Sequence, residues 1–293
     1  MKSSALLRAA SCTLTITALC VTMGQQVAQA CSRIVWTGPA GEVITGRSMN
    51  WPHAFNTHLM VIPRGEKNVG FAREHGPTRE SKNDTAIAAG SANIGGPMDV
   101  SADGMNKMGL GANLLYMAEC DFGPMPGGDK PRISWGAWVQ YVLSNYATVA
   151  EAVAAFEKNP VYLVPASLGP GGNAAPTLHL ALSDPTGDSA VIESLEGKPV
   201  IHHGKEFTVT TNSPTYDKQL TLNNYWSAVD GSKTVRSSRR SEDRFVRAGC
   251  YLSKLPPATG EREQLAGVLS VMRIVSVPWG EPDPRHPNIA PTY

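Results

Sequence analysis

The residue with the clearest capacity for chemistry is Cys31, because a cleavage signal stands directly before it. Lys2 and Arg8 give the chain a positive start, and an apolar stretch follows over residues 9–23. The run Ala28-Gln29-Ala30 then supplies the small-x-small pattern at which a secretory signal peptide is cut. Removal of residues 1–30 would leave Cys31 first, with a thiol and a free α-amine on one residue. Such a pair is a nucleophile that carries its own base.

The two groups suit each other near neutral pH. A free thiol has a pKa near ~8.5 and an α-amine one near ~7.7–8.0, so the amine is partly unprotonated and can accept the thiol proton. Other interpretations of Cys31 are a disulfide, simple packing, or the lipid anchor of a bacterial lipoprotein. The long polar Gln29 disfavours the anchor, since such signals usually carry small residues before the cysteine.

Further polar segments could act with the thiol. Arg47 lies in Gly46-Arg47-Ser48-Met49-Asn50-Trp51, and an arginine beside a thiol favours the thiolate. Asn212 lies in Thr211-Asn212-Ser213-Pro214, where its amide could donate to a developing oxyanion. The stretches 109–116 and 239–247 complete the set. Other interpretations remain open. Arg47 could be a solvent-facing strand arginine, Asn212 a turn-forming residue, and 239–247 a solvated helix face.

The elements that position these residues begin with a hairpin. Residues 32–36 and 42–49 read as two strands around a Gly-Pro turn, with Cys31 at the open end. Further strands are expected at 58–63, 85–93 and 110–116, with a surface loop over 64–84 and a turn at residues 103–106. A second group of strands is expected at 179–183, 190–193, 200–203 and 207–211.

Helical spacing of apolar residues appears between and after the two groups of strands. It covers 134–146, where Trp135 and Trp138 suit core packing, and 149–158, which Thr148 and Glu151 would cap. The last helices are expected at 243–255 and 261–275, and 168–176 reads as a loop. Strands and helices in this order predict an α+β domain with helices outside the sheets.

Composition excludes several classes of partner. The net charge of +1 gives no electrostatic case for nucleic acid, and no apolar run after the leader is long enough for a transmembrane span. The histidines are scattered, and the adjacent His202 and His203 would point to opposite faces of a strand, so no metal site is expected. Cys120 and Cys250 could form a disulfide or remain buried thiols.

Taken in order, five motifs resemble the choloylglycine hydrolase family of bile salt hydrolases and penicillin V acylases, which are N-terminal nucleophile hydrolases. The leader and the run Ala-Asn-Leu-Leu-Tyr are more similar to the Gram-negative branch. The resemblance spans nearly all of residues 31–293. The motifs are Cys31, Gly46-Arg47-x-Met49-x-Trp51, Met105-Asn106-x-x-Gly109-Leu110, Thr211-Asn212-Ser213-Pro214 and Arg244-Phe245-Val246-Arg247-Ala248.

The resemblance implies a four-layer αββα sandwich and gives each residue a role. Cys31 would attack the amide carbonyl with Arg47 beside its sulfur, and Arg244 would complete the charged set, although Arg247 is close in sequence. Asn212 and a backbone N–H near Tyr116 would form the oxyanion hole. A pocket for an apolar acyl group would be lined by Met49, Trp51, Leu115, Tyr116 and Met117, for which core packing is the alternative.

The chain departs from the family in two places. Asn50 stands where the family usually has a catalytic aspartate, so an acceptor oxygen is kept but a negative charge is lost. We expect a weaker enzyme or a shifted pH optimum. The sequence also stops at Tyr293, where family members generally continue with more strand, which suggests truncation and an exposed sheet edge.

The leading functional prediction is a periplasmic or secreted hydrolase of linear amides that forms an acyl-thioester on Cys31. The substrates implied by the family are penicillin V, conjugated bile salts and N-acyl homoserine lactones, with no cofactor and a homotetramer as the suggested assembly. Alternatives are a weak or inactive periplasmic binding homologue, a lipoprotein anchored through Cys31, and a distantly related amidase of the acid-ceramidase or acylethanolamine type. That last type matures by self-cleavage, which this chain would not need.

Overall fold

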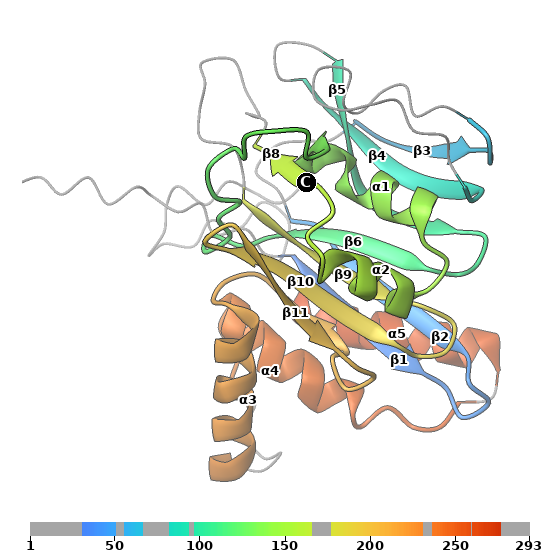
Figure 1. Ribbon diagram of the computed structural model, residues 1–293. Helices are drawn as coiled ribbons and strands as arrows, with labels where there is room; N and C mark the ends of the chain where they lie inside the picture. Colours follow the sequence, from blue (N-terminus) through green and yellow to red (C-terminus); the bar gives the residue numbers. More distant parts are fainter. Residues whose placement is uncertain are drawn as a thin grey trace, which may run out of the picture.

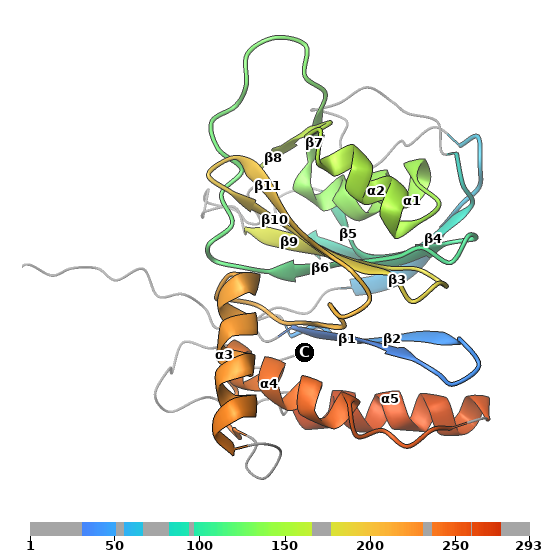
Figure 2. The same ribbon diagram turned by 60° about the horizontal axis from the view of Figure 1, so that its bottom comes forward.

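The computed structural model describes residues 31–50, 56–66, 82–93, 97–165, 177–230, 236–258 and 260–276. Two antiparallel sheets lie face to face, and helices cover the outer side of each sheet (Figure 2). This is the αββα sandwich that the motifs predicted. Part of the expected loop at 64–84 and all of the loop at 168–176 fall outside the described residues, as does Trp51.

The larger sheet has seven strands in the order β11-β10-β9-β6-β5-β4-β3. Its strand bounds are β3 Asn56–Ile62, β4 Thr85–Asn93, β5 Pro97–Asn106, β6 Gly111–Tyr116, β9 Leu178–Ser183, β10 Ser189–Leu195 and β11 Lys198–His203. The strands β6 and β9 lie side by side in its middle, with Tyr116 opposite Leu178. Buried residues alternate along these strands between the two faces of the sheet, which gives the sheet one apolar face on each side.

The smaller sheet has the order β12-β1-β2 and carries the nucleophile candidate. Strands β1 (Ser32–Thr37) and β2 (Val43–Ser48) form the predicted hairpin, and β12 (Val209–Thr210) pairs with the other edge of β1. Ser32 pairs with Ser48, so Cys31 lies at the open end of the hairpin as expected. The same register sets Arg33 opposite Arg47.

Helices on the outer face of the smaller sheet are α4 (Ser241–Leu252) and α5 (Glu261–Val275), as Figure 2 shows. Gly46 on β2 allows α5 to come close. A Cβ at this position would lie 2.8 Å from Cγ1 of Val268 and 2.9 Å from Cγ of Met272. Any larger residue would push the helix away from the strand that carries Arg47.

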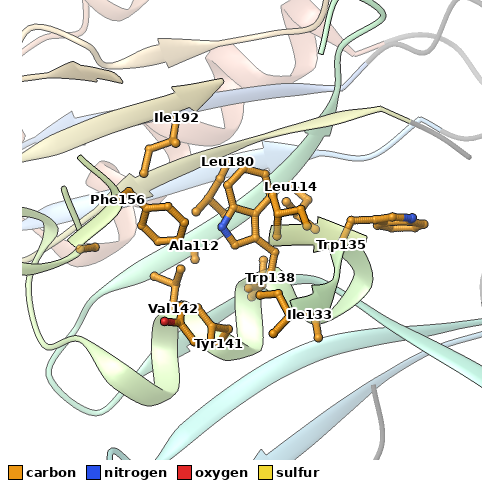
Figure 3. Close-up of a cluster of buried hydrophobic side chains, with 14 of the residues drawn as sticks. Ala112, Leu114, Ile133, Trp135, Trp138, Tyr141, Val142, Phe156, Leu180 and Ile192 are labelled. Atoms are coloured by element: carbon orange, nitrogen blue, oxygen red, sulfur yellow. The ribbon is translucent and has the colours of Figure 1, made fainter. Parts of the chain in front are cut away.

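The opposite outer layer contains the largest apolar cluster (Figure 3). A 3-10 turn (Trp135–Ala137), α1 (Trp138–Asn145) and α2 (Val149–Phe156) pack on the larger sheet. The ring of Trp138 meets Phe122 and Phe156, with centroids 6.4 Å and 6.0 Å away. Trp135 and Trp138 are therefore core residues, as predicted. Thr148 caps α2 by accepting from the backbone N–H of Glu151, also as predicted.

Residues 103–106 were expected to form a turn, and this prediction is wrong. They are the end of β5, where Thr85 of β4 pairs with Asn106 and Asp103 pairs with Asn113 of β6. The chain reverses just afterwards, where Gly109 has a φ of +85°. The side chain of Asn106 stabilises this turn by accepting from the backbone of Met108 and Leu110. Asn106 is therefore the last residue of β5, and its side chain holds the turn that follows the strand.

Four elements were not predicted: β5 as a whole, β7 (Arg132–Ser134), β8 (Tyr162–Val164) and α3 (Tyr216–Asp230). Helix α3 stands apart from the layers (Figure 1). Only its first turn is buried, through Tyr216 and Gln219. Its sequence therefore lacks the apolar stripe by which helices are recognised. The paired strands β7 and β8 are too short to give a periodic signal.

Candidate active site

Cys31 lies between the two sheets. Its side chain is 3% exposed and packs in an apolar cluster with Leu115, Ala181 and Val191 of the larger sheet. On the side of β2, the Nη2 atom of Arg47 lies 3.9 Å from the Cys31 sulfur. This is the contact that the sequence led us to expect. A guanidinium at this place favours the thiolate form of a cysteine.

Arg47 is held in place by two further contacts. Its Nη1 atom forms an ion pair with Oδ2 of Asp103 at 2.8 Å, and its Nη2 atom donates to the carbonyl oxygen of Leu114 at 2.7 Å. Both partners belong to the larger sheet. The arginine therefore bridges the two sheets beside the sulfur, and its position depends on the way the sheets pack.

Arg244 approaches from α4 on the other side of the smaller sheet. It is almost fully buried, and its Nη1 atom donates to the carbonyl oxygen of Cys31 and to the hydroxyl of Ser32. Its Nη2 atom donates to Oδ1 of Asn212 at 2.8 Å. Burial lowers the pKa of Arg244 to about 10. It still carries its charge at neutral pH and ties Asn212 to the backbone of the nucleophile candidate.

Arg247, the neighbour that sequence order could not separate from Arg244, has a different role. Its guanidinium donates to the carbonyl oxygens of Ile274, Arg236 and Ser238. These contacts join α4 to the segment before it and to the end of α5. None of them reaches Cys31 or Asn212.

Asn212 and Tyr116 are in contact, and their role as an oxyanion hole stays a prediction. The Nδ2 atom of Asn212 donates to the carbonyl oxygen of Tyr116 at 2.8 Å. Since its Oδ1 atom accepts from Arg244, the orientation of the amide is fixed by both neighbours. An amide nitrogen carries two hydrogens, so one donor of Asn212 stays available for an oxyanion.

The backbone around Asn212 is held by polar side chains that sequence reasoning missed. Gln219 donates to the carbonyl oxygen of Asn212 at 2.6 Å, and Ser241 accepts from its backbone N–H at 2.7 Å. The ring of His179 lies 2.9 Å from the carbonyl oxygen of Thr211. Ser241 lies in the singled-out stretch 239–247, but no motif marks Gln219 or His179, because these residues come from different elements and meet only in the fold.

Two other missed residues, Arg33 and Asp103, lie in the polar layer between the sheets with Asn113 of the singled-out stretch 109–116. The Nε atom of Arg33 donates to Asn113 at 2.8 Å, and Asn113 donates to Asp103 at 2.7 Å. A signal for Arg33 exists in the sequence, because strand alternation places it on the same face as Cys31. Asp103 was hidden by the incorrect turn prediction at 103–106.

The predicted pocket residues lie in different surroundings. Leu115 and Met117 are fully buried, and Met49 packs on the same cluster as Cys31. Tyr116 packs instead on the cluster below α1 and α2, where burial and the charge of Glu119 raise the pKa of its phenol. Asn50 is 7% exposed. A role of these side chains in binding stays a prediction.

Cys120, Cys250, His202 and His203 lie outside the contacts described above. Cys120 and Cys250 are free thiols, and burial raises the pKa of Cys120 to about 12. His202 and His203 point to opposite faces, toward Glu193 and Asp188 respectively. Within the part of the chain that the structure describes, no group of three or more His, Cys, Asp or Glu could hold a metal ion. No helix of the described residues is long and apolar enough to cross a membrane.

Comparison with known proteins agrees with this geometry. The model of the linear amide C–N hydrolases, choloylglycine hydrolase family, matches residues 31–290. The chain belongs to this family. It is 40% identical over 307 residues to the penicillin V acylase of Pectobacterium atrosepticum, a match that covers 100% of this chain and 81% of that protein. It is 29% identical over 197 residues to a bile salt hydrolase/transferase of Clostridium perfringens, across 67% of this chain and 57% of that protein.

Solved structures give the same result for this choloylglycine hydrolase family member. The penicillin V acylase of Agrobacterium tumefaciens superposes with a TM-score of 0.77 at 43% identity, over 89% of this chain and 77% of that one. A mutant conjugated bile acid hydrolase of Clostridium perfringens superposes with a TM-score of 0.73 at 20% identity, over 87% and 82%. The second match supports the fold alone. The protein is an amidohydrolase that acts on linear amides.

Proposed function

We propose that this amidohydrolase forms an acyl-thioester on Cys31, which becomes its first residue when residues 1–30 are removed. The observation that carries the proposal is the convergence on Cys31 of two arginines from different elements. Arg47 lies 3.9 Å from the sulfur, and Arg244 binds both the Cys31 carbonyl oxygen and Asn212. A cysteine that served only for packing would not need either charge.

In the proposed reaction, the α-amine of Cys31 accepts the thiol proton while Arg47 stabilises the thiolate. The sulfur attacks the amide carbonyl carbon, and the carbonyl electrons move to oxygen. Asn212 donates its free amide hydrogen to that oxyanion, together with a backbone N–H near Tyr116. The intermediate collapses, the C–N bond breaks, and the α-ammonium returns its proton to the departing amine. Water then attacks the thioester, which releases the carboxylic acid and restores the thiol.

Penicillin V is the substrate we favour, because relatives at 40% and 43% identity are named penicillin V acylases. Conjugated bile salts and N-acyl homoserine lactones are the other candidates, since each joins an apolar acyl group to a small polar amine. We further propose export to the periplasm or beyond, through the leader over residues 1–30. A homotetramer is the assembly suggested by the family resemblance.

The test is the intact mass of the exported protein, measured with and without an excess of penicillin V. We expect a mass that begins at an unmodified Cys31 and a release of product amine over many turnovers. The Cys31→Ser variant should lose turnover. The Cys250→Ser variant should keep it, because Cys250 is a free thiol on α4 away from the site. A lipid on Cys31 or a retained Ala30 would contradict the proposal, because neither leaves a free thiol and amine.

A binding homologue without turnover is a second candidate, favoured by one observation. Asn50 is a buried amide at the position where the family usually carries an aspartate. If capture of one acyl group per molecule occurred without further amine release, the protein would bind its ligand covalently and not act as a catalyst. Repeated amine release excludes this candidate.

A further inference from the structure

A third arginine lies in the layer that holds the nucleophile candidate. Arg33 follows Cys31 by two residues on β1, and it is fully buried at 0% exposure. Its Nε atom donates to Asn113, but its buried Nη1 and Nη2 atoms have no hydrogen-bond partner among the described residues. A buried guanidinium with so few partners lowers the stability of a fold. A residue of this kind calls for an explanation other than packing.

Asn113 links Arg33 to the contacts of Arg47. It accepts from Arg33 at 2.8 Å through Oδ1 and donates through Nδ2 to Oδ1 of Asp103 at 2.7 Å. The other oxygen of Asp103 pairs with Nη1 of Arg47 at 2.8 Å. One carboxylate is therefore placed between two guanidiniums. The register of the sheets brings them together, since Arg33 pairs with Arg47 and Asp103 pairs with Asn113.

The charges of this layer do not cancel. Burial lowers the pKa of Arg33 to about 10, and the nearby Tyr216 and Asp103 counteract this fall. Arg33 is thus still a cation at neutral pH. The other titratable groups that face the layer are Arg47 from β2, Arg244 from α4, Tyr216 from α3, and the buried pair His179 and Glu193 from the larger sheet; burial raises the pKa of Tyr216, which stays neutral. Asp103 pairs directly with Arg47 and is linked to Arg33 through Asn113.

We propose that Arg33 is a positioning residue of the active site: through Asn113 and Asp103 it fixes Arg47 beside the Cys31 sulfur and leaves the charge of Arg47 available to the thiolate. With Arg33 present, the negative charge of Asp103 is divided between two cations. Without it, Asp103 would neutralise Arg47 alone, and the attraction between Arg47 and the sulfur would weaken. The inference deepens the proposed role of Cys31 and rests on it.

The test measures how fast iodoacetamide alkylates Cys31 in the mature protein, from acidic to alkaline pH, with intact mass as the readout. Arg33→Met replaces the cation with an apolar chain of similar length. We expect the midpoint of the alkylation curve to rise by about half a pH unit or more. Arg33→Lys keeps the charge and should leave the midpoint near that of the native protein.

A second pair of variants separates charge from packing. Asp103→Asn should lower the midpoint, because Arg47 loses its counter-charge. Combining it with Arg33→Met should bring the midpoint back to the native value or below it, a reversal that a packing defect would not produce. Asp84→Asn is the matched control, since Asp84 pairs with Lys107 at 3.1 Å on the surface and should change nothing.

An unchanged midpoint in a folded Arg33→Met protein would overturn the inference, and a thermal melt establishes folding. If that variant does not fold, Asp103→Asn decides alone: a native midpoint there overturns the inference as well. Alkylation does not require hydrolysis. If the variants show the expected shifts of the Cys31 midpoint while the native protein releases no amine from penicillin V, the result would support this inference and contradict the proposed function.

Discussion

The two faces of the larger sheet are built for different purposes. The outer face, under α1 and α2, is filled with aliphatic and aromatic side chains such as Trp138 and Phe156 (Figure 3). The inner face, toward the smaller sheet, carries polar side chains such as Asp103 and Asn113, which bind Arg47 and Arg33 of the smaller sheet. Apolar burial stabilises by roughly 25 cal/mol per Å². Buried charge has to be offset by such packing and is retained where it serves reactivity.

A single strand serves both faces. On β6, Ala112 and Leu114 contribute to the outer cluster, whereas Leu115 packs beside Cys31 and Asn113 joins the polar layer. Strand alternation places successive side chains on opposite sides of the sheet. The comparison teaches that stability and reactivity are separated here by a single residue step and not by separate domains. Changes on the two faces should therefore have different consequences.

The largest effect should follow from a change in the outer face. Trp138→Ala removes a fully buried indole that contacts Phe122 and Phe156. We expect a loss of about 3–5 kcal/mol in the free energy of unfolding, because a large cavity is left. Activity per folded molecule should stay within a few-fold. Denaturant unfolding measures the stability, and active-site titration gives the activity per folded molecule. A loss of activity without a loss of stability would contradict the separation of the two faces.

Changes around the nucleophile candidate should have the reverse pattern. Arg244→Met leaves Asn212 without the donor that fixes its amide, so we expect a fall of about 10²–10³ in kcat/KM, as for the loss of an oxyanion donor. Arg247→Met, three residues further along α4, is the matched control, since it contacts only backbone carbonyls away from Cys31. Equal losses of kcat/KM in both variants would show that α4 acts only as a scaffold.

A smaller gain should follow from Asn50→Asp. A carboxylate near the α-amine of Cys31 favours its charged form and raises the pKa of the amine, which makes it a stronger base. We expect a several-fold higher turnover, with the acidic limb of the pH profile moved to higher pH. Steady-state kinetics across pH measures both. No gain in rate would exclude the missing aspartate as a reason for weak activity.

The smallest effect concerns Cys120, which should stay unmodified. Burial raises the pKa of Cys120 to about 12, so almost no thiolate is present at mildly alkaline pH. Brief treatment with iodoacetamide should label Cys31 and leave Cys120 unlabelled in the folded protein, as peptide mapping can measure. Labelling of Cys120 at the rate of Cys31 would show that its raised pKa does not suppress its reactivity.

The sequence alone was enough to predict the placement of residues that depends on chain order. The leader pattern predicts a cleavage point directly before Cys31, and the hairpin signal places Arg47 on the strand that returns beside it. Helices and most strands were predicted because their apolar period is local. By contrast, α3 and the end of β5 were missed, because one has little buried surface and the other carries turn-like residues.

Only the tertiary structure decided which charges meet at the nucleophile candidate. It distinguished Arg244 from Arg247 and placed Asp103 and Asn113 between Arg33 and Arg47. These contacts join residues far apart in the chain, across the space between two sheets. A sequence pattern fixes the face on which a side chain lies, because strand and helix periods are local. The partner on the opposite face depends on how the sheets pack.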